Sequence, residues 1–419
     1  MIPPDPHVKR SKSRSPRSHH GSQPISTPGG IAGVSAVMIG RDSSLQQLLA
    51  RLYTLLEGGD TQLITILGEP GIGKSRLAYE FYQQVARMPD APRFYRFKGD
   101  PQRSALPHGL IRQLITTLFE IDEDEPQARA ISRIEQGVAA MLGEERIEEA
   151  HILGYLAGLD LEDSPHLSRL CHDVRQIRER AIQAAMQIIA HLTSSAPMVL
   201  VIDDFQDVDD SSIDMIERAA QIGHGVSLMI ICLSQRRLLE RRPHWGEQAL
   251  NATRIDLQHL DEHQSRRLVG EILRKAGKLP TDLRNLIVRR AEGNPLYIEE
   301  LIKMLVTDGV ILPGDDKWQI QVGRLPRLRI PSTLSDLLRA RLAPLGPLER
   351  SYLAAASVAG SSFWVGALAA MLGQEPTNCA QILQTIEAYN LIASQPESSL
   401  PGEQEYRFSH DLLREAIYD

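Results

Sequence analysis

The segment Gln62–Arg76, with the sequence QLITILGEPGIGKSR, constrains the fold of this 419-residue chain more than any other stretch. Its first part, Gln62–Leu67, is a short run of apolar and β-branched residues, which predicts a buried parallel strand. Gly68–Ser75 then fits the pattern G-x-x-x-x-G-K-S/T, and Arg76–Gln84 continues as a helix. A strand, a glycine-rich loop and a helix in this order predict an α/β fold, with a parallel sheet and flanking helices.

The loop has the chemistry that a polyphosphate requires. Its glycines allow a sharp turn and let backbone N–H groups approach an anion. The helix that follows adds positive dipole, Lys74 adds a mobile charge, and the Ser75 hydroxyl is a ligand for Mg²⁺. We therefore expect ATP or ADP with Mg²⁺, and we assign the whole loop and the residue after it to the nucleotide site: Gly68, Glu69, Pro70, Gly71, Ile72, Gly73, Lys74, Ser75 and Arg76.

Two further apolar runs end on polar residues. Met198–Asp204 (MVLVIDD) predicts a buried strand, and the ligands of open α/β sheets gather at the carboxyl ends of such strands. We expect Asp203 to hold Mg²⁺ through water and Asp204 to orient or deprotonate the attacking water. Ser227–Leu233 predicts another strand, which leads to Arg236 as a sensor of the γ-phosphate. The alternatives are a strand that ends in a polar turn and a basic start to a loop.

The remaining periodicity predicts mostly helices. Residues 262–308 form helices that the segment Gly293-Asn294-Pro295 interrupts. A hairpin of Leu391–Ser394 with Glu405–Phe408 follows several helices, which indicates a winged helix. The other predicted elements are the strand Arg93–Phe97 and the helices Ser43–Leu56, Leu110–Leu118, Arg175–Leu192, Ser332–Ala343, Gly346–Ala359, Phe363–Leu372 and Asn378–Tyr389.

The charge of the chain is distributed unevenly. The whole chain has a net charge of −7, and residues 1–35 hold five basic side chains against one acid, which gives them a charge of +4. The rest of the chain therefore carries a net charge of −11. A net-acidic body argues against DNA as a partner, and the basic, Ser/Pro-rich tail is predicted to be disordered.

No apolar run reaches about 18 residues, which argues against a membrane span. The three cysteines form no CxxC motif, which favours a reducing compartment. We expect a cytoplasmic protein.

In this order the motifs resemble those of the STAND class of AAA-related signalling ATPases. The likeness is strongest to the ATPase module of large LuxR-type bacterial regulators and of class III adenylyl cyclases similar to soluble adenylyl cyclase. It covers roughly Val37–Asp419 and rests on IGRD, LGEPGIGKSRL, VLVIDDFQDVDD, ICLSQRR, GNPLYIEEL and FSHDLLREAIYD. It implies a tail (1–35), a P-loop ATPase domain (36–256), an all-α lid domain (257–325) and a winged-helix domain (326–419).

The resemblance also implies roles for three residues outside the P-loop. Arg41 of IGRD would lie near the adenine, and Pro295 would pack against it. His410 would reach the β-phosphate of ADP and hold a closed state, with Asp411 as its orienter. Ser409 stands where the family has methionine, and a helix-capping His-Asp pair is the alternative.

Together these features predict an ATP-binding signalling switch with slow ATPase activity. ADP would favour a closed state, and ATP an open state that self-associates or binds a protein partner. Related proteins carry an effector and a helical-repeat sensor that we do not recognise in this sequence, so we expect a truncated or split product, or an effector on another polypeptide. A DNA-binding winged-helix ATPase of the origin-recognition type and a nucleotide-binding scaffold without turnover are the alternatives.

Overall fold

The computed structural model describes residues 37–100, 107–122, 125–161, 164–167, 174–314, 317–327, 329–395, 398, 400 and 402–418. The predicted tail, 1–35, lies outside the described residues. The described chain divides into two compact units. The first unit comprises residues 51–65 and 85–253, and the second comprises residues 37–50, 66–84 and 254–418.

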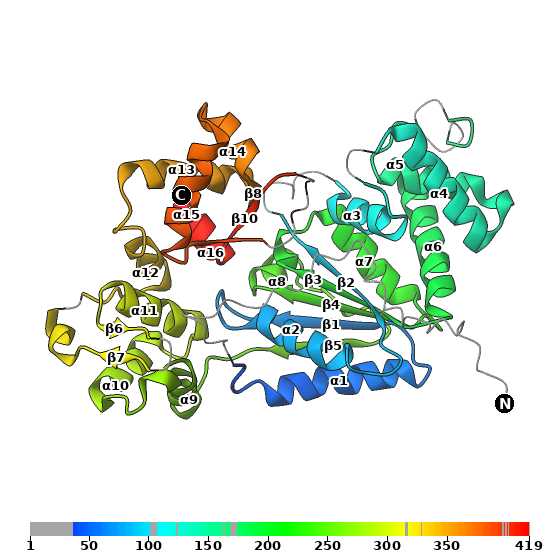
Figure 1. The fold of residues 1–419 in the computed structure, drawn as a ribbon. Helices are drawn as coiled ribbons and strands as arrows, with labels where there is room; N and C mark the ends of the chain where they lie inside the picture. Colours follow the sequence, from blue (N-terminus) through cyan, green and yellow to red (C-terminus); the bar gives the residue numbers. More distant parts are fainter. Residues whose placement is uncertain are drawn as a thin grey trace, which may run out of the picture. The chain divides into compact units, whose positions relative to one another are not determined.

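A five-stranded sheet has the strand order β2-β3-β4-β1-β5 (Figure 1). Its strands are β1 (Gln62–Leu67), β2 (Arg93–Lys98), β3 (Met198–Asp203), β4 (Leu228–Ser234) and β5 (Ala252–Asp256). Strands β2, β3 and β4 are parallel, and every residue of β1, β3 and β4 is buried, as in a sheet that is covered on both faces. The predicted parallel α/β fold is confirmed. The sequence did not predict β5, which lies at the sheet edge and has mostly exposed or half-buried residues.

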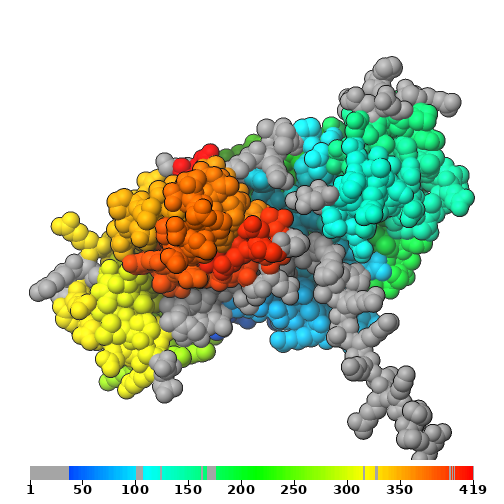
Figure 2. All heavy atoms as spheres, turned by 45° about the horizontal axis from the view of Figure 1, so that its top comes forward, coloured from blue at the N-terminus to red at the C-terminus, as the bar shows by residue number. Residues whose placement is uncertain are grey.

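Helices surround the apolar core of the first unit. Residues of β3, such as Leu200 and Ile202, pack in one cluster with residues of α3, α4, α5, α6 and α7. In Figure 2 the spheres of α4 and α5, coloured turquoise, form one closely packed block. The helices up to β5 are α1 (Asp42–Leu56), α2 (Lys74–Val85), α3 (Gly109–Leu118), α4 (Gln127–Leu142), α5 (Ile147–Leu156), α6 (Val174–Thr193), α7 (Asp210–Ile222) and α8 (Arg237–Arg241).

The second unit continues after β5 with three helices and a short hairpin. A capping box starts α9 (Glu262–Ile272), in which Asp261 and Gln264 satisfy each other's backbone N–H groups. The next helices are α10 (Thr281–Ala291) and α11 (Pro295–Thr307), so the chain breaks where the sequence predicted. Strands β6 (Ile311–Leu312) and β7 (Gln319–Ile320) pair antiparallel, and α12 (Leu334–Ala340) follows.

The last part of the chain combines helices with a three-stranded antiparallel sheet of order β8-β10-β9. The predicted hairpin is confirmed by β9 (Ile392–Ser394) and β10 (Glu405–Phe408). The predicted helix Phe363–Leu372 is wrong at its start, because Phe363 lies in β8 opposite Tyr406 and packs on Phe408. The remaining elements are α13 (Pro347–Ala359), β8 (Ser362–Trp364), α14 (Val365–Leu372), α15 (Pro376–Glu387) and α16 (Asp411–Tyr418). Within the described ranges, none of the helices is long and apolar enough to span a bilayer.

Candidate functional site

The glycine-rich loop joins β1 to α2 and contains two glycines with left-handed backbone. Their φ angles are 76° at Gly71 and 103° at Gly73, a region that favours glycine. A Cβ on Gly73 would meet no heavy atom within 4 Å, so this residue borders open space at the N-terminus of α2. A Cβ on Gly71 would lie 2.7 Å from Leu296 Cβ. Gly73 thus leaves the room that a phosphate needs at a helix N-terminus, and Gly71 allows α11 to approach the loop.

Lys74 is held inside the loop that it belongs to. It is only 8% exposed, and its Nζ donates to the carbonyl oxygens of Gly68 (2.8 Å) and Glu69 (3.1 Å). Ser75 is exposed, and Arg76 Nε donates to Glu80 Oε1 at 2.9 Å. The loop therefore presents an ammonium, a hydroxyl and a helix N-terminus, which is the donor set that a phosphate with Mg²⁺ requires.

Arg41 supports the loop from the segment that precedes α1. Its side chain is buried, and its guanidinium donates to the carbonyl oxygen of Ile72 at 3.0 Å. Burial lowers the pKa of the Arg41 guanidinium from its ordinary value, but arginine side chains in proteins stay charged at neutral pH. The structure therefore brings Arg41 to the phosphate loop. Its predicted contact with adenine stays a prediction.

Pro295 is the first residue of α11, and Asn294 fixes it beside the loop. The Asn294 side chain accepts hydrogen bonds from the backbone N–H groups at the start of α11 and donates through Nδ2 to Pro70 O at 3.0 Å. Leu296 N also donates to Gly71 O at 3.2 Å. Our sequence analysis missed Asn294, although an asparagine directly before a proline is the usual signal for an N-cap followed by the first helical residue.

The first unit holds the two predicted acids at the end of β3. Asp203 is buried, and its Oδ2 accepts from the Arg96 guanidinium at 2.8 Å, which offsets its charge. Among the residues that the structure describes, no group of three or more histidines, cysteines or acids is arranged to hold a metal ion. Mg²⁺ in nucleotide sites is bound by one or two protein oxygens together with phosphates and water. The Asp203 carboxylate is one such oxygen, and its pairing with Ser75 around Mg²⁺ stays a prediction.

The sequence predicted that the strand would include Asp204, and this is wrong by one residue. Asp204 does not continue β3, because its backbone turns to a left-handed φ of 48°. Its N–H donates to Asp203 Oδ1 at 3.0 Å, and its Oδ2 lies 3.7 Å from Lys98 Nζ. A Cβ on Gly99 would lie 2.3 Å from Asp204 O, so this close approach requires glycine. The chain thus leaves the strand at Asp204.

Arg236 follows the end of β4, occupies the residue before the short helix α8 and is exposed. Two nearby arginines bind other residues of the same unit. Arg237 pairs with Asp207, and Arg241 donates to the carbonyl oxygen of Val208 at 2.9 Å. The exposed position is compatible with the predicted role of Arg236 as a phosphate sensor, which stays a prediction.

His410 lies directly before α16, far along the chain from the loop. Its Nδ1 accepts from Leu413 N at 3.1 Å, so the histidine caps α16. Its Nε2 lies 3.5 Å from Glu300 Oε1 in α11. Asp411 accepts from Ser361 Oγ at 2.8 Å. The structure therefore places His410 beside a carboxylate of α11, and its contact with a phosphate stays a prediction.

Glu300 is the centre of a buried ionic cluster that the sequence analysis missed. It is 0% exposed, Lys303 Nζ lies 2.6 Å from its Oε1, and Arg341 pairs with its Oε2. Burial alone would raise the pKa of Glu300, but Lys303 and Arg341 hold it well below its ordinary value. The only sequence signal was a Glu–Lys pair at i,i+3 on a helix whose other residues are mostly apolar.

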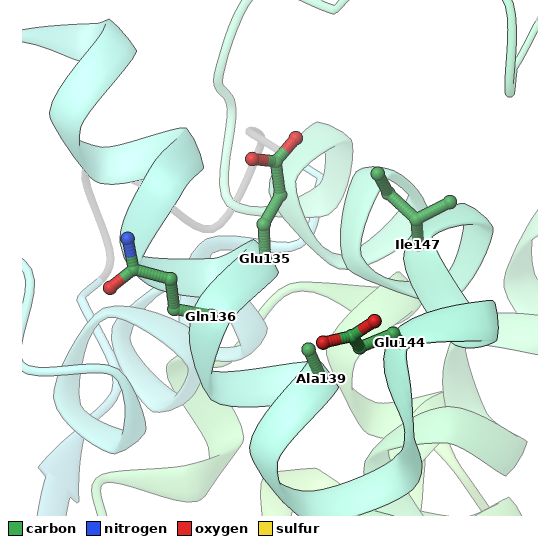
Figure 3. A pocket seen from close by; sticks show the side chains of 5 residues that line it. All are labelled: Glu135, Gln136, Ala139, Glu144 and Ile147. Carbon is green, nitrogen blue, oxygen red and sulfur yellow. The ribbon is translucent and has the colours of Figure 1, made fainter.

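A small pocket lies apart from these residues, between α4 and the start of α5 (Figure 3). Its volume of about 190 Å³ is below the ~300–1,000 Å³ that ligand sites usually have. The side chains that line it include two carboxylates and no cation, which does not suit a phosphate: Glu135, Gln136, Ala139, Glu144 and Ile147.

Comparison with known proteins supports an ATPase domain. Residues 37–231 match the family described as AAA ATPase domain, and residues 261–317 match a domain of unknown function. An uncharacterized protein of Rhizobium meliloti (strain 1021) is 26% identical over 396 residues, which cover 91% of this chain and 35% of that protein. This chain therefore spans about a third of the length of the curated relative. The family match confirms the predicted AAA-type ATPase module.

Two of the solved structures to which this chain is similar share only 14% identity with it. One is a STAND protein with a tetratricopeptide repeat sensor from Pyrococcus horikoshii, with a TM-score of 0.47 and 14% identity over 95% of this chain and 44% of that chain. The other is the ORC1 protein of Aeropyrum pernix in complex with DNA, with a TM-score of 0.42 and 14% identity over 91% of this chain and 93% of that chain. Because both TM-scores are below 0.5, the family match is the comparison on which the ATPase domain rests.

Proposed function

Because residues 37–231 form an AAA ATPase domain, we propose that this chain is an ATP-binding switch of the STAND type that hydrolyses ATP slowly. The observation that carries the proposal is the glycine-rich loop itself. Gly73 borders open space at a helix N-terminus, and Lys74 is held by the carbonyl oxygens of the same loop. Such a loop binds the phosphates of a nucleotide through its backbone N–H groups and its lysine.

Each predicted residue has one role in the proposed reaction. Lys74 binds the phosphates, Ser75 and Asp203 hold Mg²⁺, and Arg236 senses the γ-phosphate. When bound, Mg²⁺ neutralises charge that develops on the phosphate oxygens. Asp204 accepts a hydrogen bond from the attacking water and orients it for in-line attack. The Arg96–Asp203 ion pair supports this assignment, because it fixes the Asp203 carboxylate in place.

We propose that the lid (257–325) and a winged-helix domain (326–419) close on bound ADP. Helix α11 supports this part of the proposal, because it contacts both the P-loop and the last part of the chain. Asn294, directly before α11, binds the P-loop, and Glu300 within α11 contacts Arg341 and His410. In the closed state Pro295 would pack on the adenine and His410 would approach the β-phosphate. Moving such an equilibrium from 1:99 to 99:1 requires about 5.5 kcal/mol of differential binding.

For the ATP state we propose self-association or binding of a protein partner. DNA is disfavoured as a partner by two sequence features, the net-acidic body and the composition of α14, a candidate recognition helix. Its sequence, VGALAAML, carries neither lysine nor arginine, although helices that bind DNA use these residues to contact phosphates.

The variant Lys74→Ala tests the proposal. Loss of a charge-assisted contact removes about 1.5–3 kcal/mol, so the affinity for ATP and ADP should fall by about 10–100-fold. Isothermal titration or a fluorescent nucleotide measures this directly. The matched control is Lys278→Ala, which removes an exposed lysine of the lid and should bind as the wild type does. Equal affinity of Lys74→Ala and wild type would refute nucleotide binding by this loop.

A further inference from the structure

We infer that Gln206 is a positioning residue for ATP hydrolysis, whose side-chain amide orients the Asp204 carboxylate and connects it to the end of β4. The inference rests on the proposed function, because it takes Asp204 as the group that orients the attacking water. Gln206 lies in the 3₁₀ turn Phe205–Asp207 that directly follows the two acids, and it is only 5% exposed.

The amide of Gln206 makes contacts at both ends. Its Nε2 donates to Asp204 Oδ1 at 3.3 Å and to Asp207 Oδ2 at 2.8 Å. Its Oε1 accepts from Gln235 N at 2.9 Å and from Ser234 Oγ at 3.2 Å. One buried side chain therefore joins the acid at the end of β3 to the backbone at the end of β4.

Chemistry fixes which way this amide points. A backbone N–H such as that of Gln235 can only donate, and an ionised carboxylate such as that of Asp207 can only accept. Rotation of the amide by 180° would place a donor against the N–H and an acceptor against both carboxylates. The orientation is therefore set by its partners, and the Asp204 carboxylate meets a donor.

A neutral donor suits this task better than a cation. Asp204 has a left-handed backbone, and Lys98 Nζ lies 3.7 Å from its Oδ2. A second ammonium or guanidinium would compete with the water for the carboxylate as a charged donor, whereas an amide orients the carboxylate with a weaker, neutral hydrogen bond. Gln206 thus holds Oδ1 in place, and the carboxylate keeps other acceptor positions for a water molecule.

The other end of the amide reaches the proposed phosphate sensor. Gln235, whose N–H binds Gln206 Oε1, directly precedes Arg236. A movement of Arg236 toward a phosphate would displace the backbone of Gln235. Because Gln235 N–H is bound to Gln206 Oε1, the Gln206 amide would move with it. The same amide would pass that displacement to the Asp204 carboxylate. Gln206 thus couples the sensing of the γ-phosphate to the orientation of the water.

A double-mutant cycle tests this inference with the full chain: wild type, Gln206→Leu, Asp204→Asn and the double variant. The assay measures single-turnover hydrolysis of radiolabelled ATP and equilibrium binding of ATP with Mg²⁺. Because a misplaced catalytic group loses about 10–100-fold in rate, Gln206→Leu should lower kcat by about that factor and change ATP affinity by less than about threefold. In the Asp204→Asn background the same substitution should have little further effect on kcat, because the carboxylate that Gln206 orients has already been replaced.

Gln62→Leu is the matched control. Gln62 is also buried and donates to a backbone carbonyl oxygen in the same unit, that of Asp60. Its loss should lower the Tm and leave kcat unchanged, which shows what a merely structural glutamine does. If Gln206→Leu fails to fold, Gln206→Glu keeps the acceptor for Gln235 N–H and removes the donor that faces Asp204 and Asp207, so it should show a loss of kcat and the same coupling to Asp204→Asn.

The outcomes separate the two proposals. A wild type that binds ATP but does not hydrolyse it refutes the hydrolysis part of the proposed function, and this inference with it. A wild type that hydrolyses ATP and loses turnover in Asp204→Asn, but not in Gln206→Leu or Gln206→Glu, refutes this inference alone. Losses that simply add in the double variant would also overturn it, because they would show that Gln206 acts through the fold.

Discussion

Glu300→Gln should destabilise the second unit strongly, because it removes the carboxylate that two buried cations share. Glu300 is fully buried, Lys303 Nζ lies 2.6 Å from its Oε1, and Arg341 pairs with its Oε2. A neutral amide would leave both cations buried without a counter-charge, and loss of one partner of a buried pair costs about 3–5 kcal/mol. For a unit of about 150–250 residues, this loss corresponds to a fall in Tm of roughly 6–20 °C.

The pH dependence of this loss follows from the pKa of Glu300, which Lys303 and Arg341 hold well below its ordinary 4.5 against the effect of burial. A carboxyl with a lowered folded-state pKa contributes stability above its unfolded pKa, and the contribution disappears as the pH falls through the folded pKa. The difference in Tm between wild type and Glu300→Gln should therefore be complete at neutral pH and shrink below pH 4.5. Calorimetry of the full chain across this range measures it.

The neighbouring Glu299 supplies a control with the opposite sign. Burial raises the pKa of Glu299 to about 7, so its ionisation opposes folding as the pH rises from 4.5 through 7. Glu299→Gln should therefore raise the Tm relative to wild type, and the gain should grow over the same pH range. Shifts of the same sign in both variants, or shifts that do not change with pH, would refute the ionic account of this cluster.

Two other variants test the proposed nucleotide chemistry. Asp204→Asn should bind ATP with Mg²⁺ as the wild type does but hydrolyse it at least about 100-fold more slowly, because the water loses its base; a wild-type rate would place the base elsewhere. His410→Ala should reduce the ADP-induced rise in Tm, as expected for a group that reaches the β-phosphate. The same ADP-induced rise in both proteins would leave His410 as the cap of α16, whose loss lowers the Tm equally with and without ADP.

Three of the strands that the sequence predicted have a simple physical signature. Strands β1, β3 and β4 are buried along their whole length, so each is a continuous apolar run in the sequence. Strand β5, with the sequence ATRID, lies at the sheet edge and keeps polar side chains, so no apolar run marks it. Phe363 was assigned to a helix because its partners, Tyr406 and Phe408, lie more than 40 residues away in the sequence.

The same distinction applies to the site. The phosphate loop consists of consecutive residues, so its spacing is visible in the sequence alone. Asn294 binds Pro70, which is 224 residues away, and Gln206 binds Gln235, which is 29 residues away. Glu300 meets Arg341 across 41 residues. Neither Gln206 nor Glu300 differs from a surface residue until the fold supplies these partners, and no single sequence reports such long-range pairs.

Helix α11 suggests how a movement at the loop would reach the end of the chain. Asn294 binds the loop at the start of α11, and Glu300 lies six residues further, which is about 9 Å along a helix. A nucleotide-dependent shift of α11 must therefore either carry Arg341 with it or break a buried ion pair. Breaking the pair costs about 3–5 kcal/mol, which is most of the ~5.5 kcal/mol that a complete switch requires. We therefore expect α11 and α12 to move as one body, with the pair of Glu300 and Arg341 intact in both states.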